Sequence, residues 1–375
     1  MVLDRLSAAE QRLLEQTRRD PDDYGILRPH ADTNLTVKSV SRDTALLLYT
    51  LAEPNFLPSY AIDQLGERCD SVIGAMIADG ILEIEVAGIM LSGPSALHSL
   101  EVAPPAGDGR SRLGALSRRA LDYGAALQID DPRQLSWRLY TYNCVPASER
   151  WHRLWGNPDS VEGYLQINAR HFGGTREDRW LRSTPETTDA AWMAWHSVQP
   201  AKGQANAPIF KLYVSPAPYE LAASFGAIGR ALFDSRAFSW KAGNGVYGLL
   251  RADKIVAYFH DLADLHAAAA ELQKNLGACV AQGVPFTSGI DDRGLLSWGI
   301  DRARSSDAVA SDESRSWRAR LCDLMATALI QACSSPEGSA ALADFALQRL
   351  RFEGIDPTSW TPTAEFDWYS PSGRA

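Results

Sequence analysis

Two segments rich in proline, glycine and small polar residues divide the chain into three parts. The first segment spans residues 93–112 and the second spans residues 199–208. These compositions are typical of linkers, because such residues favour turns over helix or strand interiors. A chain of 375 residues is long enough for two or three domains. We therefore expect domains at residues 1–105, 106–200 and 201–375.

The first part shows a regular order of short periodic segments. Leucines at near-helical spacing predict an amphipathic helix over residues 1–20. Further along, we expect a strand at 34–40, helices at 41–51, 60–67 and 70–79, and a hairpin over 81–91 that turns at Ala87-Gly88. Three helices closed by a hairpin predict a winged helix-turn-helix domain.

The second and third parts differ in their periodicity. Residues 113–200 are predicted to be mainly helical, and we expect their tryptophans to pack in the core: Trp137, Trp151, Trp155, Trp180, Trp192 and Trp195. Beyond residue 208, we expect strands at 210–214, 238–241, 249–259, 284–287 and 295–299. Helices are expected at 219–233, 262–276, 315–333 and 340–352. The fold class is therefore α+β, with a winged-helix N-terminus, a helical middle and a C-terminal α+β domain.

Composition excludes several classes of protein. The net charge of −9 leaves no broad basic surface for a nucleic-acid backbone. The first residues lack the pattern of a signal peptide, and no apolar run approaches the roughly 20 residues of a membrane span. Five widely spaced cysteines without a C-x-x-C pair indicate neither a disulfide framework nor a zinc site. We therefore expect a cytoplasmic protein with no nucleic-acid or membrane partner.

Motifs for a bound cofactor are weak. Gly243–Gly248 matches G-x-G-x-x-G, but we expect a strand after it, whereas a dinucleotide fingerprint opens a helix. We interpret this segment as a turn between strands. The seven histidines show no metal-ligand spacing, and no P-loop is present. The sequence therefore indicates neither a metal nor a cofactor.

Lysine is unevenly distributed along the chain. Only six lysines occur among 37 basic residues, and three of them fall between 211 and 254. The segment 211–258 holds Lys211, Tyr213, Lys241, Arg251, Lys254 and Tyr258. Alternation places the first two on one face of a strand and separates Arg251 from Lys254 and Tyr258. Together these groups would form a cationic pocket suited to a phosphate, and crowding would lower the pKa of one lysine. The alternative is a set of charges on strand edges that face water.

Three short motifs follow one another in this region: Lys211-Leu-Tyr213, Trp240-Lys241 and the pair Arg251 and Tyr258. Their order, K-x-[H/Y] then W-K then R…Y, resembles the core of the bacterial phosphothreonine lyases. It is still more similar to their HopA-type effector relatives, which also occur as lyases in ribosomal-peptide biosynthesis. The tail from Asp344 to Pro357 is also HopA-like, so the resemblance covers about residues 208–358. The resemblance implies elimination of phosphate from phosphoserine or phosphothreonine, which leaves a dehydroamino acid.

The resemblance also implies roles for individual residues. Lys241 falls at the position of the general base, and Lys211 at a position that binds phosphate and stabilises the enolate-like intermediate. Tyr213 stands where phosphothreonine lyases carry a general-acid histidine, and tyrosine is a weaker acid at neutral pH. Arg251, Lys254 and Tyr258 are expected to line the phosphate site.

Residues 30–92 resemble the winged-helix elements that bind precursor peptides in the same biosynthetic pathways. There a leader peptide adds a strand to the hairpin, a form of β-augmentation. The residues expected to contact it are Leu82, Ile84 and Val86. DNA binding is the competing interpretation of a winged helix, but Asp63–Asp79 carries four acidic residues against Arg68 alone.

Two classes of function remain open from the sequence. The first is a lyase that acts on a precursor peptide after a separate kinase has phosphorylated it. The second is a lyase-like scaffold without catalytic activity, which presents the precursor peptide to partner enzymes. Convergence of Lys211, Lys241 and Arg251 on one site would favour the lyase.

Overall fold

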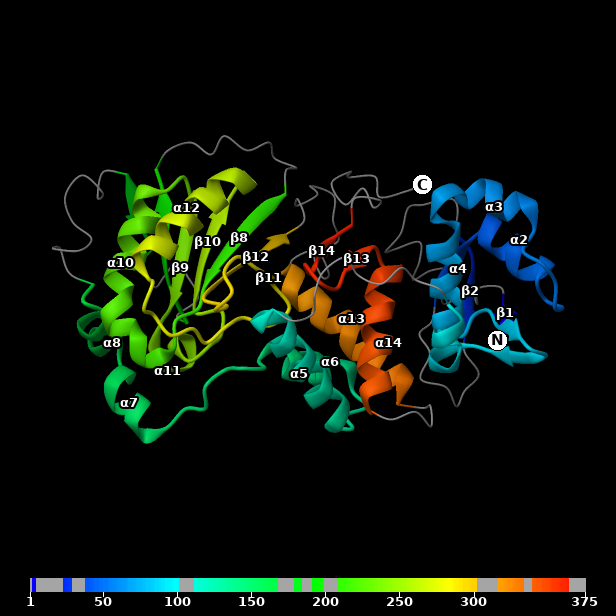
Figure 1. Cartoon of the computed structure of the whole chain (residues 1–375), viewed down its shortest axis with the longest axis horizontal. Helices are drawn as coiled ribbons and strands as arrows, with labels where there is room; N and C mark the ends of the chain where they lie inside the picture. Colours follow the sequence, from blue (N-terminus) through cyan, green and yellow to red (C-terminus); the bar gives the residue numbers. More distant parts are fainter. Residues whose placement is uncertain are drawn as a thin grey trace. The chain divides into compact units, whose positions relative to one another are not determined.

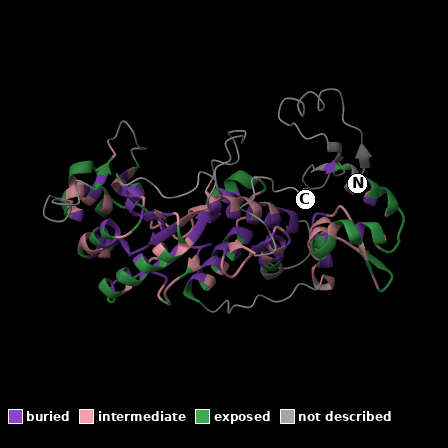
Figure 2. Cartoon of the chain, turned by 90° about the horizontal axis from the view of Figure 1, so that it is seen from above, coloured by how far each residue is buried: buried purple, intermediate pink, exposed green. Residues whose placement is uncertain are grey.

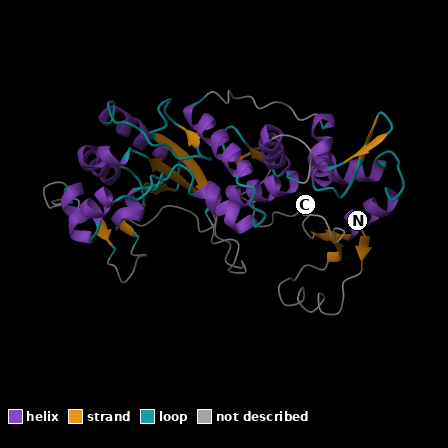
Figure 3. Cartoon of the chain, turned by 90° about the horizontal axis from the view of Figure 1, so that it is seen from below, coloured by secondary structure: helices purple, strands orange, loops and turns teal. Residues whose placement is uncertain are grey.

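The contacts between residues divide the chain into two units (Figure 1). In this computed structural model, unit 1 consists of Met1–Pro104, Gly124–Arg133 and Asp323–Ile355, and unit 2 of Pro105–Tyr123, Gln134–Cys322 and Asp356–Ala375. The structure describes residues 2–4, 23–28, 38–100, 111–167, 179–183, 191–198, 208–301, 316–333 and 339–363. Both helices and strands are present, which confirms the α+β class (Figure 3). The domain boundaries at 105 and 200 stay a prediction.

Unit 1 combines a small sheet, several helices and a hairpin. Strands β1 (Val2–Asp4), β2 (Asp23–Arg28) and β3 (Lys38–Ser41) form an antiparallel sheet. The helices are α2 (Arg42–Thr50), α3 (Ser59–Leu65), α4 (Cys69–Ala78) and α14 (Ser339–Phe352), with 3-10 helices η1 (Gly66–Arg68) and η2 (Gly93–Ser99). The hairpin is β4 (Ile84–Val86) and β5 (Ile89–Leu91).

Local sequence explains the helix start and the hairpin turn in unit 1. The Ser41 side chain accepts a hydrogen bond from the Thr44 backbone N–H and caps α2. Ala87 and Gly88 both have positive φ, 52° and 82°, as a two-residue type I′ turn requires. The predicted helices at 41–51, 60–67 and 70–79 and the hairpin are confirmed within a few residues. Their assignment as a winged helix-turn-helix domain stays a prediction.

The C-terminal helix α14 packs against α4 within unit 1. A side chain at Gly74 would collide with the Phe352 ring, so the two helices approach closely because this position is glycine. Arg349 forms a 2.7 Å ion pair with Asp79, and both side chains are buried. Residues distant in the sequence therefore share one core.

Two predictions for unit 1 are wrong where the structure describes them. Val2–Asp4 is a strand rather than part of a helix, because Leu3 pairs with Leu27 of β2; the other residues of the predicted 1–20 helix lie outside the described residues. Gly93–Ser99 is a 3-10 helix rather than a linker, and its Ala96 is fully buried. Residues 101–110 of that predicted linker are also outside the described residues.

Unit 2 is built on a seven-stranded antiparallel sheet in the order β11-β12-β8-β10-β9-β7-β6. The strands are β6 (Trp180–Arg182), β7 (Trp192–Ser197), β8 (Ile209–Val214), β9 (Ser239–Gly243), β10 (Ile255–Phe259), β11 (Ser288–Gly289) and β12 (Leu296–Asp301). Five helices lie wholly in unit 2: α7 (Glu149–Trp155), α8 (Pro158–Leu165), α10 (Leu221–Asp234), α11 (Gly245–Leu249) and α12 (Leu262–Asn275). Three more have residues in both units: α5 (Arg112–Ala126), α6 (Pro132–Tyr140) and α13 (Trp317–Ala332). Short elements η3 (Pro218–Glu220), β13 (Ile355–Asp356) and β14 (Thr361–Pro362) complete the described structure.

The central strands of the sheet are largely buried (Figure 2), and the side chains on one of its faces belong to the main hydrophobic core of unit 2. Trp240 of β9 is fully buried and stacks on Trp195 of β7, with ring centroids 4.0 Å apart. Helices α10 and α12 pack against each other, and α12 contacts β8 and β10. Burial of these aromatic side chains provides most of the driving force for this packing. The other face is left for polar chemistry.

The predicted core role holds for only part of the tryptophan set. Trp155, Trp180 and Trp195 are buried, and Trp151 packs at the edge of the core, as expected. Trp137 is 60% exposed, and Trp192 is half-buried on the opposite face of the sheet from Trp195.

The described residues 113–167 are mainly helical, as predicted, whereas Trp180–Arg182 and Trp192–Ser197 are strands of the sheet. Two further expectations for unit 2 are wrong. The five-residue helix α11 begins inside the G-x-G-x-x-G segment, at Gly245, and the next strand begins only at Ile255. Residues 284–287 form no strand; β11 starts at Ser288.

Close backbone packing accounts for the glycines of the G-x-G-x-x-G segment. A Cβ at Gly243 would collide with the Gly248 carbonyl, and Gly245 has φ +71°. The flanking strands β9 and β10 are antiparallel neighbours. A dinucleotide fingerprint instead lies in a unit of parallel strands. We therefore interpret this segment as a compact connection between two antiparallel strands.

Candidate functional site

Strand register places four of the predicted residues on the polar face of the sheet. Lys211 of β8 is opposite Tyr258 of β10, while Tyr213 is opposite Val256. Val256 is in turn opposite Lys241 of β9. Directly paired residues project from the same face of a sheet, as do residues two apart in one strand. Lys211, Tyr213, Lys241 and Tyr258 therefore share one face.

The two lysines lie on either side of one aromatic ring. The Lys211 Nζ is 5.7 Å from the centre of the Tyr258 ring, and the Lys241 Nζ is 6.0 Å from it. Lys211 is buried and forms an ion pair with the Asp301 carboxylate at the end of β12. The other carboxylate oxygen of Asp301 accepts a hydrogen bond from the backbone N–H of Trp317, at the start of α13. Lys211 is thus held in a fixed position on the face.

Trp192 connects Lys241 with Arg251. The Lys241 Nζ lies 4.0 Å from the centre of the Trp192 ring, and the Arg251 Cζ lies 5.2 Å from it. Both distances are within the range of cation–π contacts. Arg251 lies in the turn between α11 and β10, not in a strand as expected. From this turn its guanidinium reaches the same face as the lysines.

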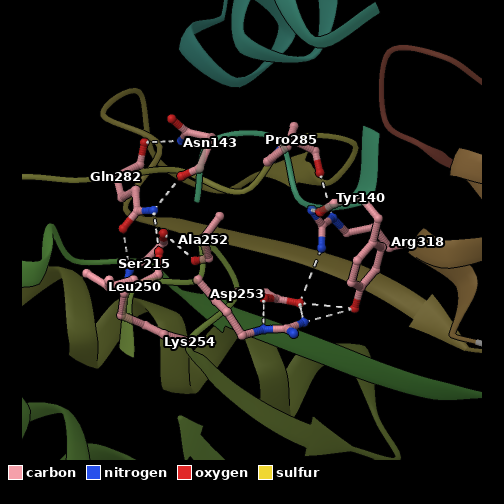
Figure 4. Close-up of polar contacts among 11 residues, drawn as sticks. Tyr140, Asn143, Ser215, Leu250, Ala252, Asp253, Lys254, Gln282, Pro285 and Arg318 are labelled. Carbon is pink, nitrogen blue, oxygen red and sulfur yellow. Dashed lines mark hydrogen bonds and ion pairs between the residues drawn. The ribbon is translucent and has the colours of Figure 1, made fainter. Parts of the chain in front are cut away.

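Asp253 holds two guanidinium groups at once (Figure 4). Its carboxylate accepts two hydrogen bonds from Arg251, at 2.8 and 2.9 Å, and one from Arg318 of α13 at 3.2 Å. The Tyr140 hydroxyl, from α6, donates to the same carboxylate at 3.2 Å. Burial alone would raise the pKa of Asp253, but Arg318 and Arg251 hold it well below its usual range. Asp253 therefore stays charged.

Arg318 is fixed on every side. Its side chain is 3% exposed, and it donates to the backbone oxygens of Pro285 and Tyr140 as well as to Asp253. Its Cζ lies 4.3 Å from the centre of the Tyr140 ring. All three guanidinium nitrogens therefore bind protein groups, and Arg318 fixes the Asp253 carboxylate in its position.

Tyr213 does not meet the requirements of a general acid. It is 5% exposed, and burial, reinforced by the nearby Asp301 carboxylate, raises its pKa well above 10. A general acid works best with a pKa near the operating pH. We therefore expect Tyr213 to keep its proton during turnover. Burial likewise raises the pKa of Tyr258.

Lys254 does not join the cluster around Tyr258 and Trp192. Its Nζ donates to Gln282 Oε1 at 2.6 Å (Figure 4) and to the Pro216 carbonyl at 2.9 Å. Gln282 also donates to the Asn143 carbonyl. Burial lowers the pKa of Lys254 to about 7, against the opposing effect of Asp253. The described contacts give Lys254 a structural role rather than the expected phosphate contact, and burial, not cationic crowding, lowers its pKa.

The low pKa of Lys254 predicts a pH-dependent stability. The unfolded chain keeps this proton up to the ordinary pKa of 10.5, whereas the folded chain loses it near pH 7. Between these values the unfolded state binds more protons, so this lysine makes folding more favourable as pH rises. Relative to Lys254→Met, the free energy of unfolding of the wild type should increase between pH 7 and 10, by roughly 4 kcal/mol at most. Below pH 6 the difference should be constant.

Urea unfolding at pH 6, 8 and 9.5 measures this dependence. Lys274→Met is the matched control, because Lys274 is exposed and pairs with Glu271 on the surface of α12. A difference between wild type and Lys254→Met that stays flat from pH 7 to 9.5 would contradict the expected titration.

The predicted peptide-contacting residues lie on or beside the hairpin of unit 1. Ile84 and Val86 are on β4, and Leu82 lies two residues before it. All three are half-buried, whereas the intervening Glu83 and Glu85 are exposed. The three apolar side chains therefore share the inner face of the strand, as alternation predicts.

Cofactor and membrane expectations can be compared only with the described part of the chain. Within those residues, no group of three or more His, Cys, Asp or Glu side chains is arranged to hold a metal ion. None of the helices described there is long and apolar enough to cross a membrane.

Five residues of the site were not assigned a role from the sequence. Four come from distant segments, and one lies between two predicted residues without an indicative pattern: Tyr140, Trp192, Asp301, Arg318 and, between Arg251 and Lys254, Asp253. Only the strand register and the turn before β10 bring them together. No local spacing signals this arrangement.

Comparisons with known proteins found similarity only among solved structures. No protein-family model matches the chain, and no curated protein matches it. An effector protein from Pseudomonas syringae pv. tomato strain DC3000 is 13% identical, with a TM-score of 0.42 over 66% of this chain and 97% of that one. The phosphothreonine lyase SpvC, an effector protein from Salmonella, is 14% identical, with a TM-score of 0.29 over 49% and 90%. The type III effector and phosphothreonine lyase OspF from Shigella flexneri is 16% identical, with a TM-score of 0.26 over 32% and 68%.

Proposed function

We propose that this chain is a lyase that eliminates phosphate from a phosphoserine or phosphothreonine residue of a peptide. The observation that carries the proposal is the convergence of Lys211, Lys241 and Arg251 around Tyr258 and Trp192 on one sheet face. Strand-edge charges facing water would not share aromatic rings in this way. The arrangement favours a lyase over a non-catalytic scaffold.

The charges of the site favour a bound phosphate. Besides the Lys241 base, Lys211, Arg251 and Arg318 provide three cationic groups, and Asp253 and Asp301 provide two anionic groups. The excess of positive charge can neutralise a bound phosphate and the charge that develops as it leaves. The Nε and Nη2 atoms of Arg251 bind Asp253, which leaves its Nη1 to donate to a phosphate oxygen, whereas the buried Arg318 contributes its charge only.

Elimination then requires one base and one leaving group. The neutral Lys241 amine takes the proton from Cα, and the electrons of that bond form the Cα=Cβ double bond. The Cβ–O bond breaks, and phosphate leaves with its electron pair. Lys211 stabilises the negative charge that builds up on the carbonyl oxygen of the same residue. Neutralisation of phosphate by the guanidinium groups replaces protonation by Tyr213.

The reaction should proceed without ATP or a divalent metal, because a base and fixed charges are enough for it. We expect phosphate release from a synthetic phosphopeptide at the same rate with and without a chelator or added ATP. A colorimetric phosphate assay under single-turnover conditions makes this measurement. Loss of turnover after chelation, restored by a metal ion, would overturn the metal-free mechanism.

We further propose that the substrate is a ribosomally made precursor peptide, phosphorylated beforehand by a separate kinase. In this proposal the N-terminal winged-helix element binds the leader of the precursor by β-augmentation at the hairpin. The half-buried alternation of Leu82, Ile84 and Val86 with exposed glutamates supports it. A cytoplasmic location of the protein is part of the same proposal.

A charge on the inner face of the hairpin should weaken leader binding. Ile84→Arg is expected to raise the dissociation constant for the precursor at least about tenfold, since it places a cation where apolar contacts are proposed. Titration calorimetry with the unphosphorylated precursor measures this change. Glu85→Arg, on the exposed face of the same strand, is the control. Equal affinities for the two variants would place leader recognition elsewhere.

A further inference from the structure

We propose that Trp192 is a positioning residue, which holds the Lys241 amine in place for removal of the Cα proton. This inference rests on the lyase function proposed above and goes beyond it, since the expected role of the tryptophans was core packing. The indole would fix the base relative to Arg251, which contacts the same ring.

The geometry distinguishes Trp192 from the core tryptophans of the same sheet. Trp195, three residues along β7, is buried and stacks on Trp240 on the core face. Trp192 is half-buried on the opposite face, and its ring centre lies 4.0 Å from a lysine nitrogen. An ammonium group at this distance is well within the 6 Å range of a cation–π contact.

The neighbouring strand β9 leaves room for the Trp192 indole. Trp192 of β7 pairs in register with Gly243 of β9. Gly243 has no side chain, and a Cβ there would collide with the Gly248 carbonyl. No side chain from β9 therefore competes with the indole at this position. Lys241, two residues before Gly243, projects from the same face.

The environment of Lys241 includes other charged and titratable groups besides the indole. Arg251 shares the ring, and Tyr258 of β10 lies on the other side of the lysine, with Lys211 beyond it. His196 of β7 lies on the same face, where it bonds to Ser239. Replacement of Trp192 leaves these groups in the chain, so a change specific to this variant reports on the indole.

Three variants separate positioning from general packing. Trp192→Leu removes the aromatic face, Trp192→Phe keeps a weaker one, and Trp298→Leu is the matched control. Trp298 is also a half-buried tryptophan of this sheet, but it lies on the core face beside Phe210 and His266. Thermal unfolding of each variant confirms that it folds.

Two measurements are made on each variant. The first is the single-turnover rate of elimination from a phosphopeptide, with its dependence on peptide concentration. We expect Trp192→Leu to lower the maximal rate by about 10- to 100-fold, because small displacements of a catalytic group have effects of this size. Trp192→Phe should lose less, and Trp298→Leu should stay close to the wild type.

The second measurement does not depend on catalysis. An amine-specific reagent labels the folded protein over a range of pH, and mass spectrometry follows the peptide that contains Lys241. A ring face favours the charged ammonium form, so Trp192→Leu should move half-labelling of Lys241 to lower pH, by roughly 0.5–1 pH unit. The same curve in Trp298→Leu should match the wild type.

The outcomes separate this inference from the proposed function. Suppose that the wild type eliminates phosphate, and that Trp192→Leu and Trp298→Leu have the same elimination rate and the same labelling curve for Lys241. The inference about Trp192 is then wrong, and the lyase function stands. If the wild type shows no elimination, the lyase function is wrong, and the catalytic role of Trp192 falls with it. A labelling shift confined to the Trp192 variants together with their loss of rate supports the inference.

Discussion

Lys241→Arg will slow phosphate elimination nearly as much as Lys241→Ala, by about two to four orders of magnitude. Arginine keeps the positive charge and could still bind phosphate. A base must however be neutral before it accepts a proton, and a guanidinium with a pKa above 12 is almost never neutral. The rate of a single turnover on one phosphopeptide, compared among the three proteins, tests this expectation.

Two further substitutions sharpen the comparison. Lys211→Arg should cost less, since Lys211 already pairs with Asp301 and its role needs a fixed charge rather than a free amine. Lys274→Arg, exposed on α12, should leave the rate unchanged. Near wild-type turnover by Lys241→Arg would mean that the base is another group.

Asp253→Asn should be the most destabilising conservative change in the site. The carboxylate is buried between Arg251 and Arg318, and its loss leaves the buried Arg318 guanidinium without its counter-charge. Removing one partner from a buried ion pair typically costs about 3–5 kcal/mol in the free energy of unfolding. Urea denaturation of the wild type and the variant measures the difference.

Asp264→Asn is the control for this stability effect. Asp264 pairs with Arg236 at 3.3 Å, and the Arg236 side chain is 82% exposed. Exposed pairs contribute about 0–1 kcal/mol, so this variant should unfold close to the wild type. Equal losses for the two aspartates would show that the buried network around Asp253 is not a structural centre of unit 2.

Strand alternation explains why part of the site could be predicted from the sequence. Lys211 and Tyr213 share a face because they lie two residues apart in a six-residue strand. The order of strand segments then brings Lys241 and Tyr258 into neighbouring strands, and the register places all four together. The alternation within each strand is local, and the sequence carries it directly, whereas the order and register of the strands are tertiary.

Arg251 and Lys254 show where alternation fails. The sequence pattern extends the strand back to residue 249, but the chain forms α11 and a turn before β10 begins at Ile255. Arg251 therefore reaches the site from a turn. Lys254 donates hydrogen bonds to the Pro216 carbonyl and to Gln282, which lie 38 and 28 residues away in the sequence. No periodicity in the sequence indicates these partners.

The remaining site residues depend on tertiary contacts between distant segments. Tyr140 and Arg318 meet Asp253 across 113 and 65 residues of sequence. Trp192 lies in β7, within a region that the sequence predicts as mainly helical, because the burial of residues along this strand does not alternate. Such residues become visible only when the strand order is known.

The mass of the product from a phosphopeptide tests the central claim most directly. Incubation with the wild type should convert the phosphorylated residue to a dehydroamino acid, which is one water molecule lighter than the residue with a free hydroxyl. Lys241→Ala should leave the phosphopeptide unchanged over the same time. A product that carries the free hydroxyl would show hydrolysis rather than elimination, and intact phosphopeptide with the wild type would contradict the proposed lyase function.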